Sequence, residues 1–506
     1  MKLTLPESTK NWTSLIGATI SLVALFMIIF LLAVSLAFNQ GGSYLGLVIY
    51  IILPAILIAG LVLIPIGMLG KRKKLNSQNI PDNISKPLPF VDLNIPGHRN
   101  ATFIFIFGTA IFLFLSAVGS YEAFHYTESV SFCGETCHNV MIPEFTAYQT
   151  SPHARVKCVE CHVGEGADWY MRSKLSGLRQ VYKTIIGEVP KPILTPIHNL
   201  RPARDICEKC HWPEKFYSRT IRNERHYLRN EESSEWDINL VMKVGSKFDA
   251  LGLEEGIHWH INPSIKIEYA ATDYRRQIIP WVKLTNEKTG EVTIFQSANN
   301  PLKIGEIDTL EVREFDCIDC HNRPSHNYKP PEFFINNSIT AGDISRELPE
   351  IKSIATSVCA QEFTTTDSAI AGIKSSIEDF YAVNYPEVIE EKNELLQKTI
   401  SAIQTKFSQN IFPEMKVRWD QYPLNIGHIK SPGCFRCHDD NHVSESGKLI
   451  SRDCNICHLL NSQGTPDKLE RTILTESLVF NHPGEDVEQE DWQDTMCSDC
   501  HEGEGP

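Results

Sequence analysis

The stretch Cys133–His162 holds two short motifs, CGETCH at residues 133–138 and CVECH at residues 158–162. Two cysteines followed at once by a histidine form the attachment signature of c-type haem, in which the thiols become thioethers and the histidine reaches the iron. The first motif lies shortly after a hydrophobic segment long enough to cross a bilayer. The sequence therefore predicts redox cofactors that begin at a membrane surface.

Seven motifs of this kind use fourteen of the fifteen cysteines. The pairs are Cys133 and Cys137, Cys158 and Cys161, Cys207 and Cys210, Cys317 and Cys320, Cys434 and Cys437, Cys454 and Cys457, and Cys497 and Cys500. The predicted proximal ligands are the adjoining histidines His138, His162, His211, His321, His438, His458 and His501. Zinc ribbons do not require a histidine directly after each pair, so the repetition favours seven covalently bound haem c groups.

Low-spin haems that transfer electrons need a sixth ligand, usually a second histidine. The predicted distal ligands are the histidines best placed near the motifs and in an Ile-His-Trp-His run, namely His153, His258, His260, His326, His428, His442 and His482. The first motif has one extra residue and is followed by Met141. Its thioether would raise the haem potential relative to two histidines. The alternatives are surface histidines and, for Met141, a simple apolar contact.

Three apolar segments precede or flank the first motif. Residues 11–70 contain no Asp, Glu, Lys, Arg or His, and we expect a hairpin of spans at 12–38 and 44–69 and a third span at about 101–120. The KRKK run at 71–74 belongs in the cytoplasm by the positive-inside rule. The chain after residue 121 is then periplasmic. These features predict a multi-pass protein of the inner (cytoplasmic) membrane.

Two function classes are excluded. None of the three predicted spans contains a histidine, so no b-type haem can be ligated within the membrane. The formal net charge of −14 makes nucleic acid an unsuitable partner, because phosphate binding needs a basic surface.

The predicted fold is a membrane-anchored multihaem cytochrome c, with three transmembrane helices and a mainly α or irregular periplasmic haem region that has a small β-containing insertion. The expected parts are a transmembrane hairpin at 1–70, a cytoplasmic linker at 71–100, a transmembrane helix with haem motifs one to three at 101–215, a β-containing insertion with motif four at 216–330, a helical spacer at 331–425 and a three-haem domain at 426–506.

Residues 102–215 resemble a known family. One span, then CHNVMIPE at 137–144, SPH at 151–153 and CHV at 161–163, with Trp169, Lys174 and Gly177 beyond, is similar to the NapC/NirT family of membrane quinol dehydrogenases. The resemblance implies oxidation of menaquinol or ubiquinol at the periplasmic membrane surface. In that family a lysine and an acidic residue near the first haem help to bind and deprotonate quinol. Lys174 best matches the lysine, which follows the second motif, and Glu144 is a candidate for the acid from its position beside the first motif. The alternative is that either residue is a solvated interfacial charge.

Seven motifs, three spans and the longer first motif depart from the usual family pattern. In these respects the chain is more similar to the heptahaem inner-membrane cytochromes of metal-reducing bacteria. The expected function is electron transfer from the membrane quinol pool to periplasmic c-type cytochromes in anaerobic or extracellular respiration. The alternatives are a passive electron-transfer subunit fed by a separate dehydrogenase and a periplasmic terminal reductase. The quinone type, terminal acceptor, distal pairing and oligomeric state stay open.

Overall fold

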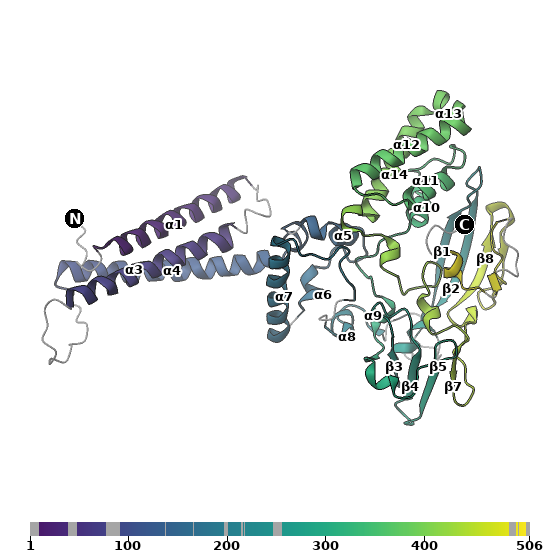
Figure 1. Cartoon of the computed structure of the whole chain (residues 1–506), viewed down its shortest axis with the longest axis horizontal. Coiled ribbons are helices and arrows are strands. Elements are labelled where there is room, and N and C mark those ends of the chain that lie inside the picture. The colour runs from purple at the N-terminus through teal and green to yellow at the C-terminus, as the bar shows by residue number, and fades with distance from the viewer. Residues whose placement is uncertain are drawn as a thin grey trace. The chain divides into compact units, whose positions relative to one another are not determined.

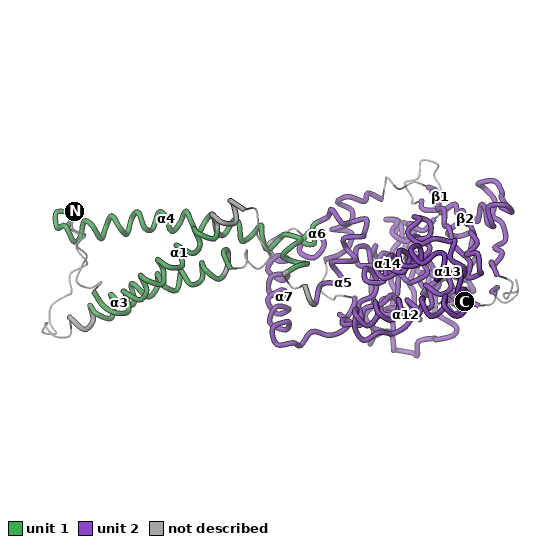
Figure 2. Tube along the Cα trace, turned by 90° about the horizontal axis from the view of Figure 1, so that it is seen from above, with its two compact units in different colours: residues 1–138, 157–159 green, residues 139–156, 160–506 purple. Residues whose placement is uncertain are grey.

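The computed structural model describes residues 10–38, 48–76, 92–136, 138–164, 166–196, 201–213, 216, 218–245, 256–484, 492–493 and 495–501. The chain divides into two compact units (Figure 2). The first consists of Met1–His138 with Lys157–Val159, and the second of Asn139–Val156 with Glu160–Pro506.

The first unit contains three long apolar helices. They are α1 (Trp12–Phe38), α3 (Leu53–Asn76, preceded by the π-helical turn η2, Val48–Ile52) and α4 (Pro96–Thr127). Each is long and apolar enough to cross a bilayer. The helix α4 extends beyond the span expected at 101–120 and includes both His98 and His125. At the helical rise these two histidines lie about 40 Å apart, so they cannot share a haem.

Small residues allow α1 and α3 to pack closely. Ser14, Ser21 and Ala24 of α1 are buried, and the Ser14 hydroxyl donates to the Ile64 carbonyl at 2.9 Å. A Cβ atom added to Gly60 of α3 would lie 2.5 Å from Ser21 Oγ. Such small residues let two helix backbones approach closely within a bilayer, where the hydrophobic effect does not drive helices together.

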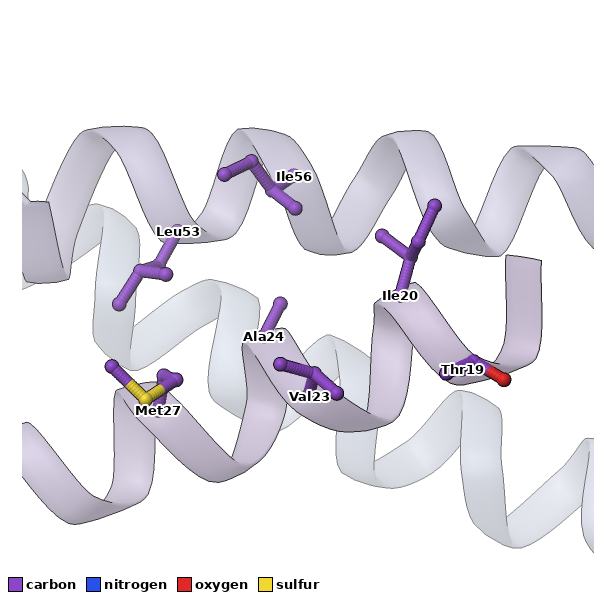
Figure 3. A pocket seen from close by; sticks show the side chains of 7 residues that line it. All are labelled: Thr19, Ile20, Val23, Ala24, Met27, Leu53 and Ile56. Atoms are coloured by element: carbon purple, nitrogen blue, oxygen red, sulfur yellow. The ribbon is translucent and has the colours of Figure 1, made fainter. Parts of the chain in front are cut away.

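A shallow apolar groove also runs between these two helices. It has a volume of about 310 Å³ (Figure 3). Its lining comprises Thr19, Ile20, Val23, Ala24, Met27, Leu53 and Ile56. Thr19 Oγ1 donates to its own helix at the Leu15 carbonyl, so the lining presents an almost wholly hydrocarbon surface.

Two antiparallel sheets lie in the second unit. The four-stranded sheet has the order β1-β2-β8-β9, with bounds Arg219–Tyr227, Glu235–Lys243, His458–Gly464 and Glu470–Arg471. The five-stranded sheet has the order β6-β3-β4-β5-β7, with bounds Val312–Glu314, Ile265–Ala270, Trp281–Asn286, Val292–Ser297 and His442–Ser444. Strands therefore occur where the sequence predicted a β-containing insertion.

C-terminal strands complete both sheets, which differs from the expected organisation. Val241 of β2 pairs with Leu459 of β8, and Gln296 of β5 pairs with Val443 of β7. The expected boundary between the insertion at 216–330 and a separate three-haem domain at 426–506 thus does not divide two folding units. Pairing with a distant strand satisfies an otherwise open sheet edge, and local sequence periodicity does not report such partners.

Five helices fill the region where a helical spacer was predicted. They are α10 (Pro331–Thr340), α11 (Ile351–Ala360), α12 (Thr366–Asn384), α13 (Pro386–Glu391) and α14 (Asn393–Asn410) (Figure 1). Their apolar faces meet in one core, in which Ile377 and Phe407 are fully buried. The unpaired Cys359 is also fully buried there, as a small apolar side chain.

The cysteine motifs lie on or directly beside short helical turns. These are η3 (Phe132–Thr136), α6 (Cys158–His162), α8 (Ala203–Cys207), α9 (Cys317–Cys320), η9 (Gly433–Arg436), η10 (Cys454–Ile456) and α16 (Cys497–His501). One turn brings two residues three apart to the same side. Longer helices follow the first two motifs, α5 (His138–Gln149) and α7 (Ala167–Ile185).

The glycine contacts lead to a prediction about the α1–α3 hairpin. Gly60→Ala should lower the thermal unfolding midpoint of the detergent-solubilised protein, because the new Cβ would also lie 2.9 Å from the Gly17 carbonyl oxygen. Gly70→Ala in the same helix is the matched control, since a Cβ there meets nothing within 4 Å. Intrinsic fluorescence during heating measures both, and equal midpoints would contradict close packing at Gly60.

Candidate metal centres

Six motif histidines of the second unit each lie opposite a second histidine from elsewhere in the chain. The ring-centroid distances are 6.2 Å for His162 and His326, 6.0 Å for His211 and His153, 6.3 Å for His321 and His258, 5.8 Å for His438 and His260, 6.2 Å for His458 and His428, and 5.9 Å for His501 and His482. Two imidazoles bound on opposite sides of one metal through bonds of about 2 Å have centroids roughly 6 Å apart. Each pair therefore has the spacing that one iron between the rings requires.

The hydrogen bonds of these rings leave one nitrogen for a metal. Backbone carbonyls accept from the Nδ1 atoms of five of them: His153 to Pro324 at 3.3 Å, His258 to Val244 at 2.9 Å, His260 to Ile257 at 2.7 Å, His326 to Glu144 at 3.0 Å and His438 to Ser451 at 2.9 Å. Among the described interactions, none occupies the Nε2 atom of any of the twelve paired rings. A carbonyl partner at Nδ1 fixes the tautomer in which Nε2 carries the lone pair.

Burial also favours the uncharged, metal-binding form at eight of the twelve paired rings. Burial lowers the pKa of His260 and of His458 to about 4. Burial is likewise the main cause of a lowered pKa at His162, His258, His321, His326, His428 and His501. The donor set therefore suits iron without prior loss of a proton.

His442 does not fit the distal role predicted for it. Its Nδ1 lies 2.8 Å from Asp439 Oδ1 and its Nε2 lies 2.7 Å from the Ile279 carbonyl oxygen, so both nitrogens are used. Burial opposes the charged ring, but the hydrogen bonds to Asp439 and to the Ile279 carbonyl, together with the charge of Asp439, outweigh it and raise the pKa of His442. A buried, ion-paired imidazolium has no lone pair for iron. Its nearness in sequence to the fifth motif could not reveal this, because the partner Ile279 lies more than 160 residues earlier in the chain.

The ring planes differ between pairs. His258 and His321 are nearly parallel at 5°, and His428 and His458 at 19°. His153 and His211 meet at 75°, whereas His260 and His438 meet at 82°. The pairs thus fall into parallel, intermediate and perpendicular arrangements, which affect the electronic structure of a low-spin iron.

The motif cysteines are available for thioether bonds. Thirteen of the fourteen are described, and none forms a disulfide. In the part of the chain that the structure describes, no group of three His, Cys, Asp or Glu side chains converges as zinc ligands would. The donor geometry instead fits haem c, with two thiols and one histidine on a turn and a second histidine across from it.

Consecutive motifs lie side by side. A hydrogen bond from Cys133 lowers the pKa of Cys158 to about 7, and one from Cys317 lowers the pKa of Cys207. The first and second motifs, and the third and fourth, are therefore adjacent. The second and third are linked through one loop, since His326 faces His162 and the Pro324 carbonyl accepts from His153.

The later motifs continue this arrangement. The pKa of Cys320 is raised to about 12 and that of Cys457 to about 11. In both cases burial is the largest cause and the neighbouring Cys434 is the second. Burial and then Cys454 raise the pKa of Cys497. The fourth motif is thus near the fifth, the fifth near the sixth, and the sixth near the seventh.

A buried carboxylate anchors the fourth motif to the five-stranded sheet. Asp319 is 2% exposed and accepts from the Tyr269 hydroxyl at 2.7 Å and from Arg313 Nε at 2.9 Å. The Asp319 carbonyl in turn accepts from Arg436 of the fifth motif at 2.8 Å. Strands β3 and β6 therefore hold two neighbouring motifs in a fixed relation, a network that the motif spacing did not predict.

Glu144, predicted as a quinol-site acid, lies behind a paired histidine. Its side chain is buried, with Oε2 3.6 Å from Arg323 and 3.3 Å from His326 Nδ1. The Arg323 guanidinium lies 4.4 Å from the Tyr422 ring centroid. This carboxylate can polarise the imidazole that faces His162.

The remaining predicted residues belong to the first motif and its surroundings. Cys133 belongs to the first unit, whereas Lys174 lies on α7 of the second, with Nζ 5.0 Å from the Tyr170 ring centroid. Met141 is half-buried on α5, one turn after His138. Residues at this spacing share a helix face, which does not favour Met141 as the ligand opposite His138. Cys137 and the His138 side chain lie outside the described residues.

Comparisons with known proteins agree with this chemistry. Residues 96–193 match the model of the NapC/NirT cytochrome c family, N-terminal region. Over 504 residues the chain is 42% identical to cytochrome c-type protein ImcH of Geobacter sulfurreducens, covering 98% of this chain and 97% of that protein. No solved structure matches. The chain therefore belongs to the NapC/NirT family of membrane multihaem c-type cytochromes, electron-transfer proteins with covalently bound haem c.

Proposed function

We propose that this chain carries seven haem c groups, oxidises membrane quinol and passes the electrons to periplasmic cytochromes in anaerobic or extracellular respiration. The observation that supports it most is the set of six histidine pairs at haem-ligand spacing. Each haem supplies one-electron redox chemistry. The chain's own residues set the spacing, the ligands and the surroundings.

The six pairs suggest which distal histidine serves which motif. In chain order of the motifs from the second to the seventh, the proposed distal ligands are His326, His153, His258, His260, His428 and His482. His442 is left as a structural residue. The neighbouring cysteines support a single file in motif order, in which every transfer is short and the ends of the file are the first and seventh motifs.

The first motif is the proposed point of entry. The apolar helix α4 ends at Thr127, shortly before Cys133, so this motif follows directly on a membrane span. With the KRKK run in the cytoplasm, the proposed topology has three crossings and places the motifs in the periplasm. Oxidation of quinol to quinone releases two protons and two electrons. Haem held by Cys133, Cys137 and His138 would take the electrons one at a time, and a base of the protein would take the protons.

We assign quinol binding to Lys174 and propose a structural role for Glu144, since its carboxylate contacts His326 and Arg323.

The α1–α3 hairpin favours the second function considered, a passive subunit fed by a separate dehydrogenase, because its helices expose large apolar side chains such as Phe26 and Phe30. A terminal reductase fits less well, since six pairs would fill both axial positions of their irons.

Replacement of one distal histidine tests the pairing. His260→Met should remove one highly anisotropic low-spin signal from the electron paramagnetic resonance spectrum, because the nearly perpendicular rings of His260 and His438 would no longer both bind iron. It should also raise the potential of one haem. His442→Met is the matched control and should keep every low-spin signal. If His442→Met lost a low-spin signal while His260→Met kept all of them, the distal ligand would be His442 and not His260.

Glu144→Gln separates two roles for this residue. Loss of the carboxylate behind His326 should raise the potential of one haem and shift its low-spin resonance, while quinol turnover stays within about twofold. Glu160→Gln removes an exposed charge from the second motif and should leave that potential in place. Unchanged potentials with a large loss of turnover would instead assign Glu144 to quinol chemistry.

Lys174→Ala tests the quinol site. The variant should reduce its haems with a menaquinol analogue roughly 10²-fold more slowly than the wild type, as expected when a group that binds or deprotonates substrate is lost. Dithionite should still reduce every haem. Lys183→Ala on the same helix should keep the wild-type rate. If the wild-type protein is reduced by dithionite but not by quinol until a second subunit is added, the passive-subunit function holds instead.

A further inference from the structure

The helix α7 turns its large apolar side chains outward. Met171, Leu175, Leu178, Tyr182 and Ile185 are 61, 60, 67, 63 and 78% exposed. Their alternating separation of four and three residues places them on one side of the helix. We call these five residues the α7 apolar face.

The opposite side of α7 is polar and faces protein. Ser173, Ser176 and Gly177 are partly buried, and the Ser173 hydroxyl donates to the His162 carbonyl at 3.2 Å. This is the reverse of α14, where Ile403 and Phe407 are fully buried. An ordinary surface helix packs its apolar side against the protein core, whereas α7 leaves its apolar side exposed.

Charged residues on α7 indicate what covers this face. The helix carries Arg172, Lys174, Arg179 and Lys183, against Asp168 as its single acidic residue. Cationic side chains beside an apolar face complement anionic lipid headgroups. The same chain also supplies three apolar helices that are able to cross a bilayer.

We infer that α7 lies along the surface of the bilayer, with the α7 apolar face inserted among the acyl chains and its cationic side chains at anionic phospholipid headgroups. The bond from Ser173 to the second motif then ties that motif to the membrane surface. This inference rests on the exposure of the α7 apolar face and on the charges of the α7 side chains. It does not depend on quinol oxidation or on the quinol role of Lys174.

Lipid photocrosslinking of the full-length holoprotein tests the inference. The protein is placed in nanodiscs of phosphatidylethanolamine and phosphatidylglycerol that contain a lipid with a diazirine in its acyl chain, and crosslinked peptides are mapped by mass spectrometry. We expect crosslinks on the α7 apolar face with helical periodicity, together with crosslinks on α1, α3 and α4 as the internal positive control. Replacing phosphatidylglycerol with phosphatidylcholine should reduce the α7 yield several-fold and leave the three long helices unchanged.

Leu175→Glu and Leu178→Glu, made singly, should abolish crosslinks on α7 while those on the three long helices persist. Val383→Glu in α12 replaces a side chain that is 79% exposed and serves as the matched control, which should retain the α7 crosslinks. Leu178→Ser provides a milder variant, and the haem absorption spectrum verifies that each protein has folded. Crosslinks on the long helices but none on α7 in the wild-type protein would overturn the inference.

Discussion

The spacing of two imidazoles on opposite sides of one iron is the constraint on which the haem-bearing unit depends. It joins residues that are far apart in the chain: His326 faces His162, and His260 faces His438. The five-stranded sheet, which contains both β3 and β7, brings the segments of the second pair together. Carbonyl groups accept from Nδ1 of five paired rings and so leave on Nε2 the lone pair that a metal would bind.

Local signals in the sequence predicted the parts of the molecule well. The cysteine motifs, the three apolar helices and the helical region around Ile377 all follow from spacing or periodicity within short windows. Non-local relations could not be predicted in the same way. Nothing in the run before Val443 indicates that it pairs with β5, and the same strand pairing turns His442 into a buried ion pair beside Asp439.

The site residues show the same division. The adjoining cysteine pair identifies each predicted proximal histidine, whereas a distal histidine is identified only by the tertiary structure. The sequence therefore predicted His442 together with six histidines that the fold does place in pairs. Closeness to the first motif predicts a quinol-site role for Glu144. In the structure, however, its carboxylate is buried beside Arg323 and His326. Its partners come from the loop after the fourth motif, which no local pattern connects to residue 144.

The central proposal is that the irons of the second to seventh motifs each bind two histidines. Near-infrared magnetic circular dichroism of the oxidised full-length protein tests it most directly, because charge-transfer bands of low-spin ferric haem distinguish two histidines from histidine with methionine. We expect at least six bis-histidine haems per chain. Fewer than six, or several high-spin haems, would contradict it.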